Sequence, residues 1–301
     1  NVYSWAVEPD VVDCLVDKSL FRAQLESLEL PHPKTLPIDS AEDLGAVPAH
    51  LFEHAFFKPH ESYHFLQACG VKAVFVTSRS DAENKLKSIQ EKGLKVVLQE
   101  YIPGPPTAHY FIDGYLPKGS TDMRLLARQR LRMYPSDFGN STDMVTVDLE
   151  EVRPAVETLD VLFRSIGYHG IFSAEFKFDR RDAKFKILEV NCRPWWYIDF
   201  ADRCGLHVSQ YAYQEALGEP VDPYDSYKLD KRGVYPINDW AARQENLRNQ
   251  KEEQSLFQLI RTWLLGYQPI FSWNDPLPAI VHFLPLAKGA IISLLSAKKR
   301  T

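Results

Sequence analysis

Residues 171–196, IFSAEFKFDRRDAKFKILEVNCRPWW, contain two segments in which apolar and polar side chains alternate. The first segment spans residues 171–179 and the second spans residues 185–193. A period of two is typical of a half-buried strand, and in the second segment it puts Leu188 on the buried face. The polar sequence between the segments predicts a hairpin turn centred on Asp182.

This register places two acidic side chains opposite each other. Glu175 faces Glu189 on the polar side of the hairpin, and Ser173 faces Asn191. The Cβ atoms of such a pair lie ~5 Å apart, and two carboxylates at that distance repel by ~3 kcal/mol at an effective dielectric constant of ~20. Carboxylate and amide oxygens suit Mg²⁺, so the candidate metal ligands are Glu175, Glu189 and Asn191. Arg193 follows on the same face, where it would meet an anion; a solvated acidic hairpin is the alternative.

The sequence EVNCRP at residues 189–194 resembles the E-[IVM]-N-x-R motif of ATP-grasp enzymes, and the resemblance extends over roughly residues 17–218. It implies an α+β fold (α/β) in which two lobes clasp ATP. It also implies that the three candidate ligands hold Mg²⁺, as two ions for which Mn²⁺ can substitute, and that Arg193 meets the transferred phosphoryl group. The sequence segments FKFDRRD and EVNCRPWW most resemble those of carboxylate–amine ligases of the D-aspartate ligase type.

Further residues match nucleotide-binding positions of the family. Lys58 ends the strand segment FFKP, where it would reach the α-phosphate and adenine; an exposed lysine at a strand edge is the alternative. QEYIPG resembles the hinge between the lobes. By that resemblance Glu100 would accept from the adenine amino group, through its side chain or its backbone carbonyl, and the Ile102 amide would donate to the ring. The predicted ATP-binding residues are Lys18, Lys58, Glu100, Tyr101 and Ile102.

Two features of many relatives are missing from the chain. The glycine-rich phosphate loop that follows the strand-end lysine is replaced by HESYHFLQACG, and the acidic residue after the hinge is replaced by GPPTAH. The resemblance therefore leaves the phosphate cover and the ribose contact without an assigned residue.

Three arginines alternate with other residues in the segment RQRLRM. Arg128, Arg130 and Arg132 share one face of the predicted strand because the side-chain period is two. A guanidinium group can donate two parallel hydrogen bonds to a carboxylate or phosphate. The alternative interpretation of the three arginines is a solvated row of charges. We take Arg130, with Arg128, as the candidate residues for binding a substrate carboxylate.

A second metal motif, H-E-x-x-H, occurs at residues 60–64. On a helix this spacing presents His60 and His64 to a zinc ion, with Glu61 as base, and Glu83 could be a third ligand. A zinc metallopeptidase is therefore one alternative function. A non-catalytic ATP-binding protein is another.

The resemblance implies an ADP-forming carboxylate–amine ligase that activates an acid as an acyl phosphate for attack by an amine. The chain begins with Asn1 rather than Met, so residues 1–16 are expected to be the tail of a missing N-terminal domain. Residues 17–98 and 99–220 are the expected nucleotide and catalytic lobes. Residues 221–301 are the expected helical extension, with one long helix over residues 241–267.

Composition restricts the remaining possibilities. The 301 residues are 45% hydrophobic, which is typical of a globular chain. A net charge of −5 argues against a general nucleic-acid binder, and no run of ~18 apolar residues suits a transmembrane span. The four cysteines form no C-x-x-C pair, which favours a reducing, cytoplasmic location. The expected partners are small-molecule acid and amine substrates, and a homodimer is compatible with the sequence.

Overall fold

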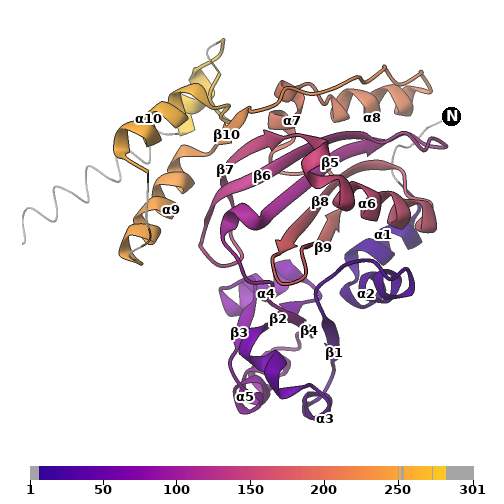
Figure 1. Cartoon of the computed structure of the whole chain (residues 1–301), viewed down its shortest axis with the longest axis vertical. Helices are drawn as coiled ribbons and strands as arrows, with labels where there is room; N and C mark the ends of the chain where they lie inside the picture. The colour runs from indigo at the N-terminus through magenta and orange to yellow at the C-terminus, as the bar shows by residue number, and fades with distance from the viewer. Residues whose placement is uncertain (1–6, 250, 252–253, 273, 283–301) are drawn as a thin grey trace, which may run out of the picture.

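The computed structural model describes residues 7–249, 251, 254–272 and 274–282. Two antiparallel sheets, one of four and one of six strands, form the centres of two lobes. Figure 1 shows the smaller lobe below the larger sheet, with the C-terminal helices at the far side of that sheet.

The smaller lobe is a four-stranded sheet in the order β1-β4-β2-β3. Its strands are β1 (Thr35–Ile38), β2 (Ala55–Pro59), β3 (Val74–Val76) and β4 (Val96–Glu100). Its helical segments are α3 (Ala41–Gly45), η1 (Ala49–His54), α4 (Ser62–Cys69) and α5 (Arg79–Gln90). The α5 helix begins where Ser78 caps it by accepting from the Asp81 amide, and its apolar side packs Leu86 and Ile89 into the core of this lobe.

The larger lobe is a six-stranded sheet in the order β10-β7-β6-β5-β8-β9. Its strands are β5 (His109–Leu116), β6 (Arg124–Tyr134), β7 (Asn140–Val147), β8 (Gly170–Asp179), β9 (Lys184–Asn191) and β10 (Arg232–Val234). The short 3₁₀ segment η2 (Pro106–Ala108) precedes β5, and η3 (Leu149–Val152) leads into helix α6 (Arg153–Ile166).

The two faces of the larger sheet are covered differently. Helix α6 covers one face together with α1 (Pro9–Val16) and α2 (Lys18–Ser27), whose Leu15, Phe21 and Leu25 belong to the same core as β5 and β8. The opposite face is covered at one end by α7 (Ile198–Cys204) and α8 (Val208–Leu217). The smaller lobe contacts the larger one where Lys58 donates to the Leu188 carbonyl and Lys72 donates to Asn140 Oδ1.

The predicted boundary of the first lobe does not match this packing. Helix α2 lies within residues 17–98 but packs on the larger sheet, because its apolar side meets the α6 face of that sheet. We propose instead that the first lobe begins at Thr35 and ends at Glu100, the limits of its sheet.

The β8–β9 hairpin has the predicted pairing of Glu175 with Glu189, but a register irregularity contributes to it. Near the turn Asp179 pairs with Lys184, so the turn is centred half a residue before Asp182. A register irregularity between Glu175 and Phe176 adds one residue on β9 and restores the predicted pairs. Ile187 and Val190 are the buried residues of β9, and Leu188 between them is half-buried.

The C-terminal extension is more closely joined to the larger sheet than predicted. Strand β10 pairs with β7, so the extension contributes one edge of the sheet. The expected single helix over residues 241–267 is two helices, α9 (Pro236–Arg248) and α10 (Leu256–Leu265). The break arises because Ser255 and Gln258 form a capping box that begins a new helix. Among the described residues, no helix has the length and apolar character needed to cross a membrane.

Candidate active site

The predicted metal ligands lie at paired positions of β8 and β9. Glu175 of β8 pairs directly with Glu189 of β9, and Ser173 pairs with Asn191. The Asn191 amide donates to Glu189 Oε1 at 3.3 Å, which leaves its own oxygen on the same side as the two carboxylates. Two carboxylates and an amide oxygen on one face are a hard oxygen set, so these residues fit Mg²⁺.

Two residues, one on β5 and one on β6, contact the Glu175 carboxylate. His109 Nδ1 lies 2.8 Å from Glu175 Oε1, and Arg130 Nη2 lies 3.2 Å from the same oxygen. Burial lowers the pKa of His109 to about 4, so the neutral ring donates its Nδ1 hydrogen to the carboxylate. Burial raises the pKa of Glu175, but Arg130 and then His109 outweigh it and hold that pKa below its usual range. Glu175 is therefore ionised at neutral pH and ready to bind a cation.

Lys58 connects the smaller lobe to the metal set. Its Nζ donates to the Leu188 carbonyl at 3.3 Å and lies 3.8 Å from Glu189 Oε2. Burial lowers the pKa of Lys58, and the Glu189 carboxylate opposes that shift. Lys58 is therefore not the solvated strand-edge lysine that was its alternative.

The predicted phosphoryl-binding residue lies at the rim of this set. The Arg193 Nη2 group donates to Asn191 Oδ1 at 3.3 Å, and its Nη1 group donates to the Pro194 carbonyl at 3.1 Å. The exposed side chain of Arg193 therefore lies next to the metal ligand Asn191. Its binding of the transferred phosphoryl group stays a prediction.

The arginine row has three different surroundings. Arg128 is 2% exposed and its Nε donates to Asp113 Oδ2 at 2.6 Å, inside the sheet. Arg132 Nη1 lies 2.7 Å from Asp239 Oδ1 of α9. Of the three, Arg130 is the arginine with an ion pair to an acid of the metal set. The geometry therefore favours Arg130 as a substrate-facing group and Arg128 as a structural one.

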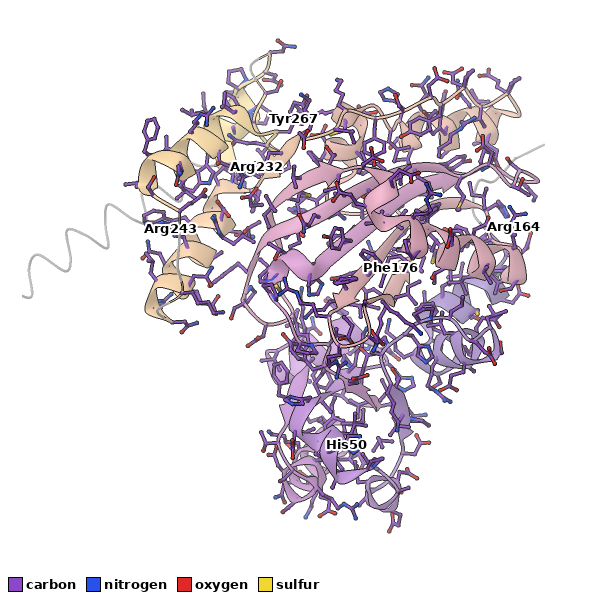
Figure 2. All side chains as sticks on the ribbon, viewed as in Figure 1. His50, Arg164, Phe176, Arg232, Arg243 and Tyr267 are labelled. Carbon is purple, nitrogen blue, oxygen red and sulfur yellow. The ribbon has the colours of Figure 1, made fainter. Side chains whose placement is uncertain are left out.

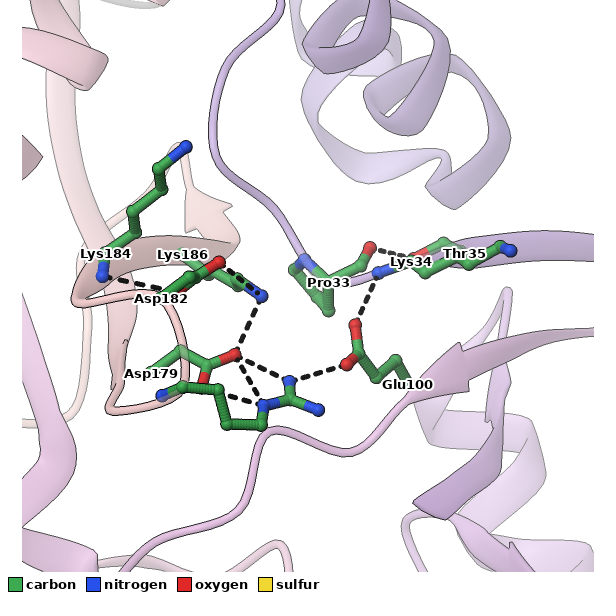
Figure 3. Close-up of polar contacts among 9 residues, drawn as sticks. Pro33, Lys34, Thr35, Glu100, Asp179, Asp182, Lys184 and Lys186 are labelled. Atoms are coloured by element: carbon green, nitrogen blue, oxygen red, sulfur yellow. Dashed lines mark hydrogen bonds and ion pairs between the residues drawn. The ribbon is translucent and has the colours of Figure 1, made fainter. Parts of the chain in front are cut away.

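The hinge residues lie between the two sheets. The side chain of Glu100 is already engaged, because its Oε1 accepts from Arg181 at 2.5 Å and its Oε2 accepts from the Lys34 amide at 3.1 Å. Figure 3 shows Glu100 across from Asp179 and Lys186, which form the other half of this polar network. The carboxylate is thus unsuited to the predicted adenine contact, and the backbone carbonyl stays as the predicted acceptor.

Two other predicted nucleotide positions border this region. The Ile102 amide donates to no protein acceptor within the part of the chain that the structure describes. Lys18, the first residue of α2, lines a small hollow that Gln99 and Leu188 also border. Lys18 thus lies beside the hinge strand and the hairpin, and nucleotide binding by Lys18 and Ile102 stays a prediction.

Sequence reasoning missed Lys177, although it shares the polar strand face with Glu175. It is 3% exposed, and its Nζ lies 4.5 Å from the centre of the Tyr101 ring. Across the described residues it forms no ion pair or hydrogen bond with an acid. Burial lowers the pKa of Lys177 to about 8. A buried amine that faces the hinge and has no anionic partner is suited to bind an anionic group of a ligand.

The zinc alternative is contradicted by the structure. His60 precedes α4, so it and His64 do not share one helical face. His60 Nδ1 lies 3.8 Å from Asp17 Oδ2, while His64 Nδ1 lies 2.6 Å from Glu61 Oε2 at the surface. In the described ranges, no group of three or more His, Cys, Asp or Glu residues is placed to hold a metal ion. Glu83, the suggested third ligand, is on α5 and completes no such group.

Comparison with known proteins supports the fold. No family model matches the chain. D-aspartate ligase from Enterococcus faecium (strain Aus0004) is 25% identical over 224 residues, which cover 70% of this chain and 52% of the relative. The chain thus spans about half the length of this curated relative.

Solved structures resemble the chain more in shape than in sequence. The biotin carboxylase domain of Hydrogenobacter thermophilus 2-oxoglutarate carboxylase, in complex with MgADP, ADP and bicarbonate, has a TM-score of 0.60 at 13% identity, over 74% of this chain and 50% of that chain. L-amino acid ligase from Bacillus licheniformis has a TM-score of 0.53 at 17% identity, over 69% of this chain and 48% of that chain. The predicted ATP-grasp fold is confirmed by these likenesses.

Proposed function

We propose that the full-length protein is an ATP- and Mg²⁺-dependent ligase that phosphorylates a substrate carboxylate and joins the acyl group to an amine, releasing ADP and phosphate. The observation that carries this proposal is the facing pair Glu175 and Glu189, with Asn191 beside them and two cations, Lys58 and Arg130, at its edge. The likeness to D-aspartate ligase and to L-amino acid ligase supports the same class of reaction. Cytoplasmic location and a homodimer stay predictions.

The protein's part in this reaction is positioning and charge neutralisation. When bound, Mg²⁺ would neutralise the β- and γ-phosphates and hold them in position. Glu175, Glu189 and Asn191 would hold the ion. Lys58 would leave Glu189 to approach the nucleotide phosphates, and Arg130 would orient the incoming carboxylate against them. Arg193, at the rim, would stabilise charge on the transferred group.

The hinge would bind the nucleotide base. The Ile102 amide and the Glu100 carbonyl are the predicted partners of adenine, with Tyr101 between them. Lys177 extends this set, because a buried amine next to Tyr101 would gain an anionic or π-face partner on binding. Lys18 would border the same region from α2.

Phosphate release tests the proposal directly. The full-length protein is incubated with ATP and Mg²⁺ and with pairs of acids and amines, and free phosphate is measured. Release that requires ATP, Mg²⁺, an acid and an amine together supports the ligase. Nucleotide binding without release for any pair would instead favour a non-catalytic ATP-binding protein.

Replacement of Arg130 with Lys is expected to weaken use of the acid substrate. Lysine keeps the charge but loses the two-pronged donor set, and loss of one charge-assisted contact costs about 1.5–3 kcal/mol. Steady-state kinetics should show this loss in the Michaelis constant for the acid or in turnover, with little change in ATP affinity. Arg132→Lys, whose partner is Asp239, is the matched control. Loss of ATP affinity with unchanged acid kinetics would place Arg130 on the nucleotide instead.

Nucleotide affinity is expected to fall as pH rises through about 8, the pKa of Lys177. Only the protonated amine attracts the nucleotide, so binding is fully supported below this pH and weakens by up to about tenfold per pH unit above it. Calorimetry with MgADP between about pH 7 and 9 measures the slope, which Lys177→Met should remove. Lys184→Met, an exposed change in the same hairpin, should keep it. Native affinity that does not depend on pH would exclude Lys177 from the nucleotide site.

A further inference from the structure

The loop between β6 and β7, residues 135–139, reaches from the larger lobe to the smaller one. The centre of its Phe138 ring lies 4.7 Å from the centre of the Phe56 ring of β2 and 4.9 Å from that of the Phe75 ring of β3. The Tyr101 ring, which follows β4 in the hinge, lies 6.4 Å from Phe138. All three partners belong to the smaller lobe or to the hinge, so this ring joins the two lobes.

The surface that Phe138 covers is on the side of the smaller lobe that faces the metal ligands. Phe56 and Lys58 lie on the same face of β2, because the side-chain period of a strand is two. Lys58 extends from this face to the larger lobe, where its Nζ lies 3.8 Å from Glu189 Oε2. The exposed side of the Phe56 ring is therefore directed between the lobes, beside the predicted phosphate-binding lysine.

The same aromatic surface borders the predicted base contacts. The Tyr101 ring lies 5.2 Å from the Phe75 ring and 6.3 Å from the Phe56 ring. Tyr101 itself lies between the Glu100 carbonyl and the Ile102 amide, the two predicted partners of adenine. Nucleotide bases stack readily on aromatic side chains, so a base at the hinge would use the surface that these three rings form.

Phe138 lies too close to its neighbours for a base to fit between them. Carbon atoms in contact are about 3.5–4.0 Å apart, so a base stacked between two rings holds them about 7 Å apart. The distances from Phe138 to Phe56 and to Phe75 are well below this value. A base can therefore reach this surface only after the Phe138 ring has moved away.

The backbone of Phe138 is strained in the position that it occupies. Its φ is 55°, in the left-handed region that a bulky side chain disfavours. The next residue keeps the turn tight, since a Cβ atom on Gly139 would clash with the Pro135 carbonyl oxygen. Such a conformation persists only where surrounding contacts hold it. Here the aromatic contacts hold it, so release of the ring would also relieve backbone strain.

Polar contacts fix the chain on both sides of Phe138. The Ser136 amide and hydroxyl donate to the Glu245 carboxylate of α9 at 3.0 and 2.9 Å, and Figure 2 shows α9, marked by Arg243, beside the larger sheet. On the other side, Lys72 Nζ of the smaller lobe donates to Asn140 Oδ1 at 3.1 Å. With both ends fixed, movement of the Phe138 side chain and its strained backbone is the smallest change that frees the aromatic surface.

We propose that Phe138 competes with the nucleotide base for the surface of Phe56, Phe75 and Tyr101, so that the β6–β7 loop closes the base site until a nucleotide displaces the ring. This inference rests on the nucleotide-binding function proposed above and adds an autoinhibitory contact to it. Only molecules in which the ring is displaced are competent to bind, so the closed loop lowers the apparent affinity for nucleotide.

Calorimetry of the full-length protein with MgADP tests the inference. Phe138→Ala removes the ring. Phe138→Gly also removes the ring and suits the left-handed φ, so it provides the test if the alanine variant does not fold. The control is Phe257→Ala, which removes an exposed ring of α10. Magnesium pyrophosphate, which contains no base, is the comparison ligand.

Both Phe138 variants are expected to bind MgADP about three- to tenfold more tightly than the native protein, as for a native competent fraction of about a tenth to a third. Phe257→Ala should bind MgADP as the native protein does, and affinity for magnesium pyrophosphate should be unchanged in every variant. Weaker MgADP binding would make Phe138 a contact of the base, and unchanged binding would separate it from the base site. An equal gain for pyrophosphate would indicate a general opening of the lobes; each of these three results overturns the inference.

The same measurements separate this inference from the ligase proposal. MgADP binding by the native protein without a gain in the Phe138 variants removes only the competition by the ring. Absence of MgADP binding from the native protein and from every variant would instead remove the nucleotide site, and the proposed ligase function with it.

Discussion

Replacement of Glu189 with Gln is expected to lower ATP turnover by at least about a hundredfold while the fold persists. The change keeps the size of the side chain but removes a charge and a metal ligand from the facing pair with Glu175. Because Glu189 is half-exposed, neutralising it should affect the free energy of unfolding little. Phosphate release measures the loss, and circular dichroism checks the fold.

A second readout of the same variant does not depend on turnover. Mg²⁺ should raise the melting temperature of the native protein only when ADP is present, since the ion needs both the carboxylates and the phosphates. Glu189→Gln should lose this increase. Asp182→Asn, at the turn of the same hairpin and 3.2 Å from Lys186, should keep it. A Glu189 variant with native turnover and a native Mg²⁺ effect would remove the metal assignment.

Replacement of Arg128 with Met is expected to lower the free energy of unfolding by about 3–5 kcal/mol. The substitution leaves Asp113, which is 0% exposed, with the Ser173 hydroxyl as a hydrogen-bond donor at 2.7 Å but without a cation. A buried charge without its counter-charge is costly. Urea unfolding followed by fluorescence measures the change.

Two further variants test the cause of that loss. Addition of Asp113→Asn to Arg128→Met removes the unpaired charge and should recover part of the stability. Arg164→Met breaks an exposed pair with Asp160, which should cost less than about 1 kcal/mol. If Arg128→Met lost no more than Arg164→Met, Arg128 would be free of a structural role and available again as a substrate ligand.

The sequence alone determined the chemistry of the hairpin. Alternation put Glu175 and Glu189 on one face, and the motif identified the fold before any tertiary contact was known. The pairing of Glu175 with Glu189 was right, yet it depends on two departures that cancel, a turn centred before Asp182 and an extra residue on β9. A bulge changes spacing by one residue without a clear mark in composition, so alternation did not identify Ile187 as a buried residue.

Periodicity also identified the arginine row but not its partners. It states which face of a strand a side chain occupies, whereas the partner on that face comes from another segment. Asp113 lies 15 residues from Arg128 and Asp239 lies 107 residues from Arg132. Only the folded chain therefore distinguishes the structural arginines from Arg130.

The tertiary structure alone decided the environment of Lys177 and the exclusion of zinc. The pKa of Lys177 is lowered because folding buries its amine beside Tyr101. His60 fails as a zinc ligand because helix α4 begins after it. Burial and charge pairing arise from such distant segments, so local sequence patterns, which report on neighbours along the chain, do not contain them.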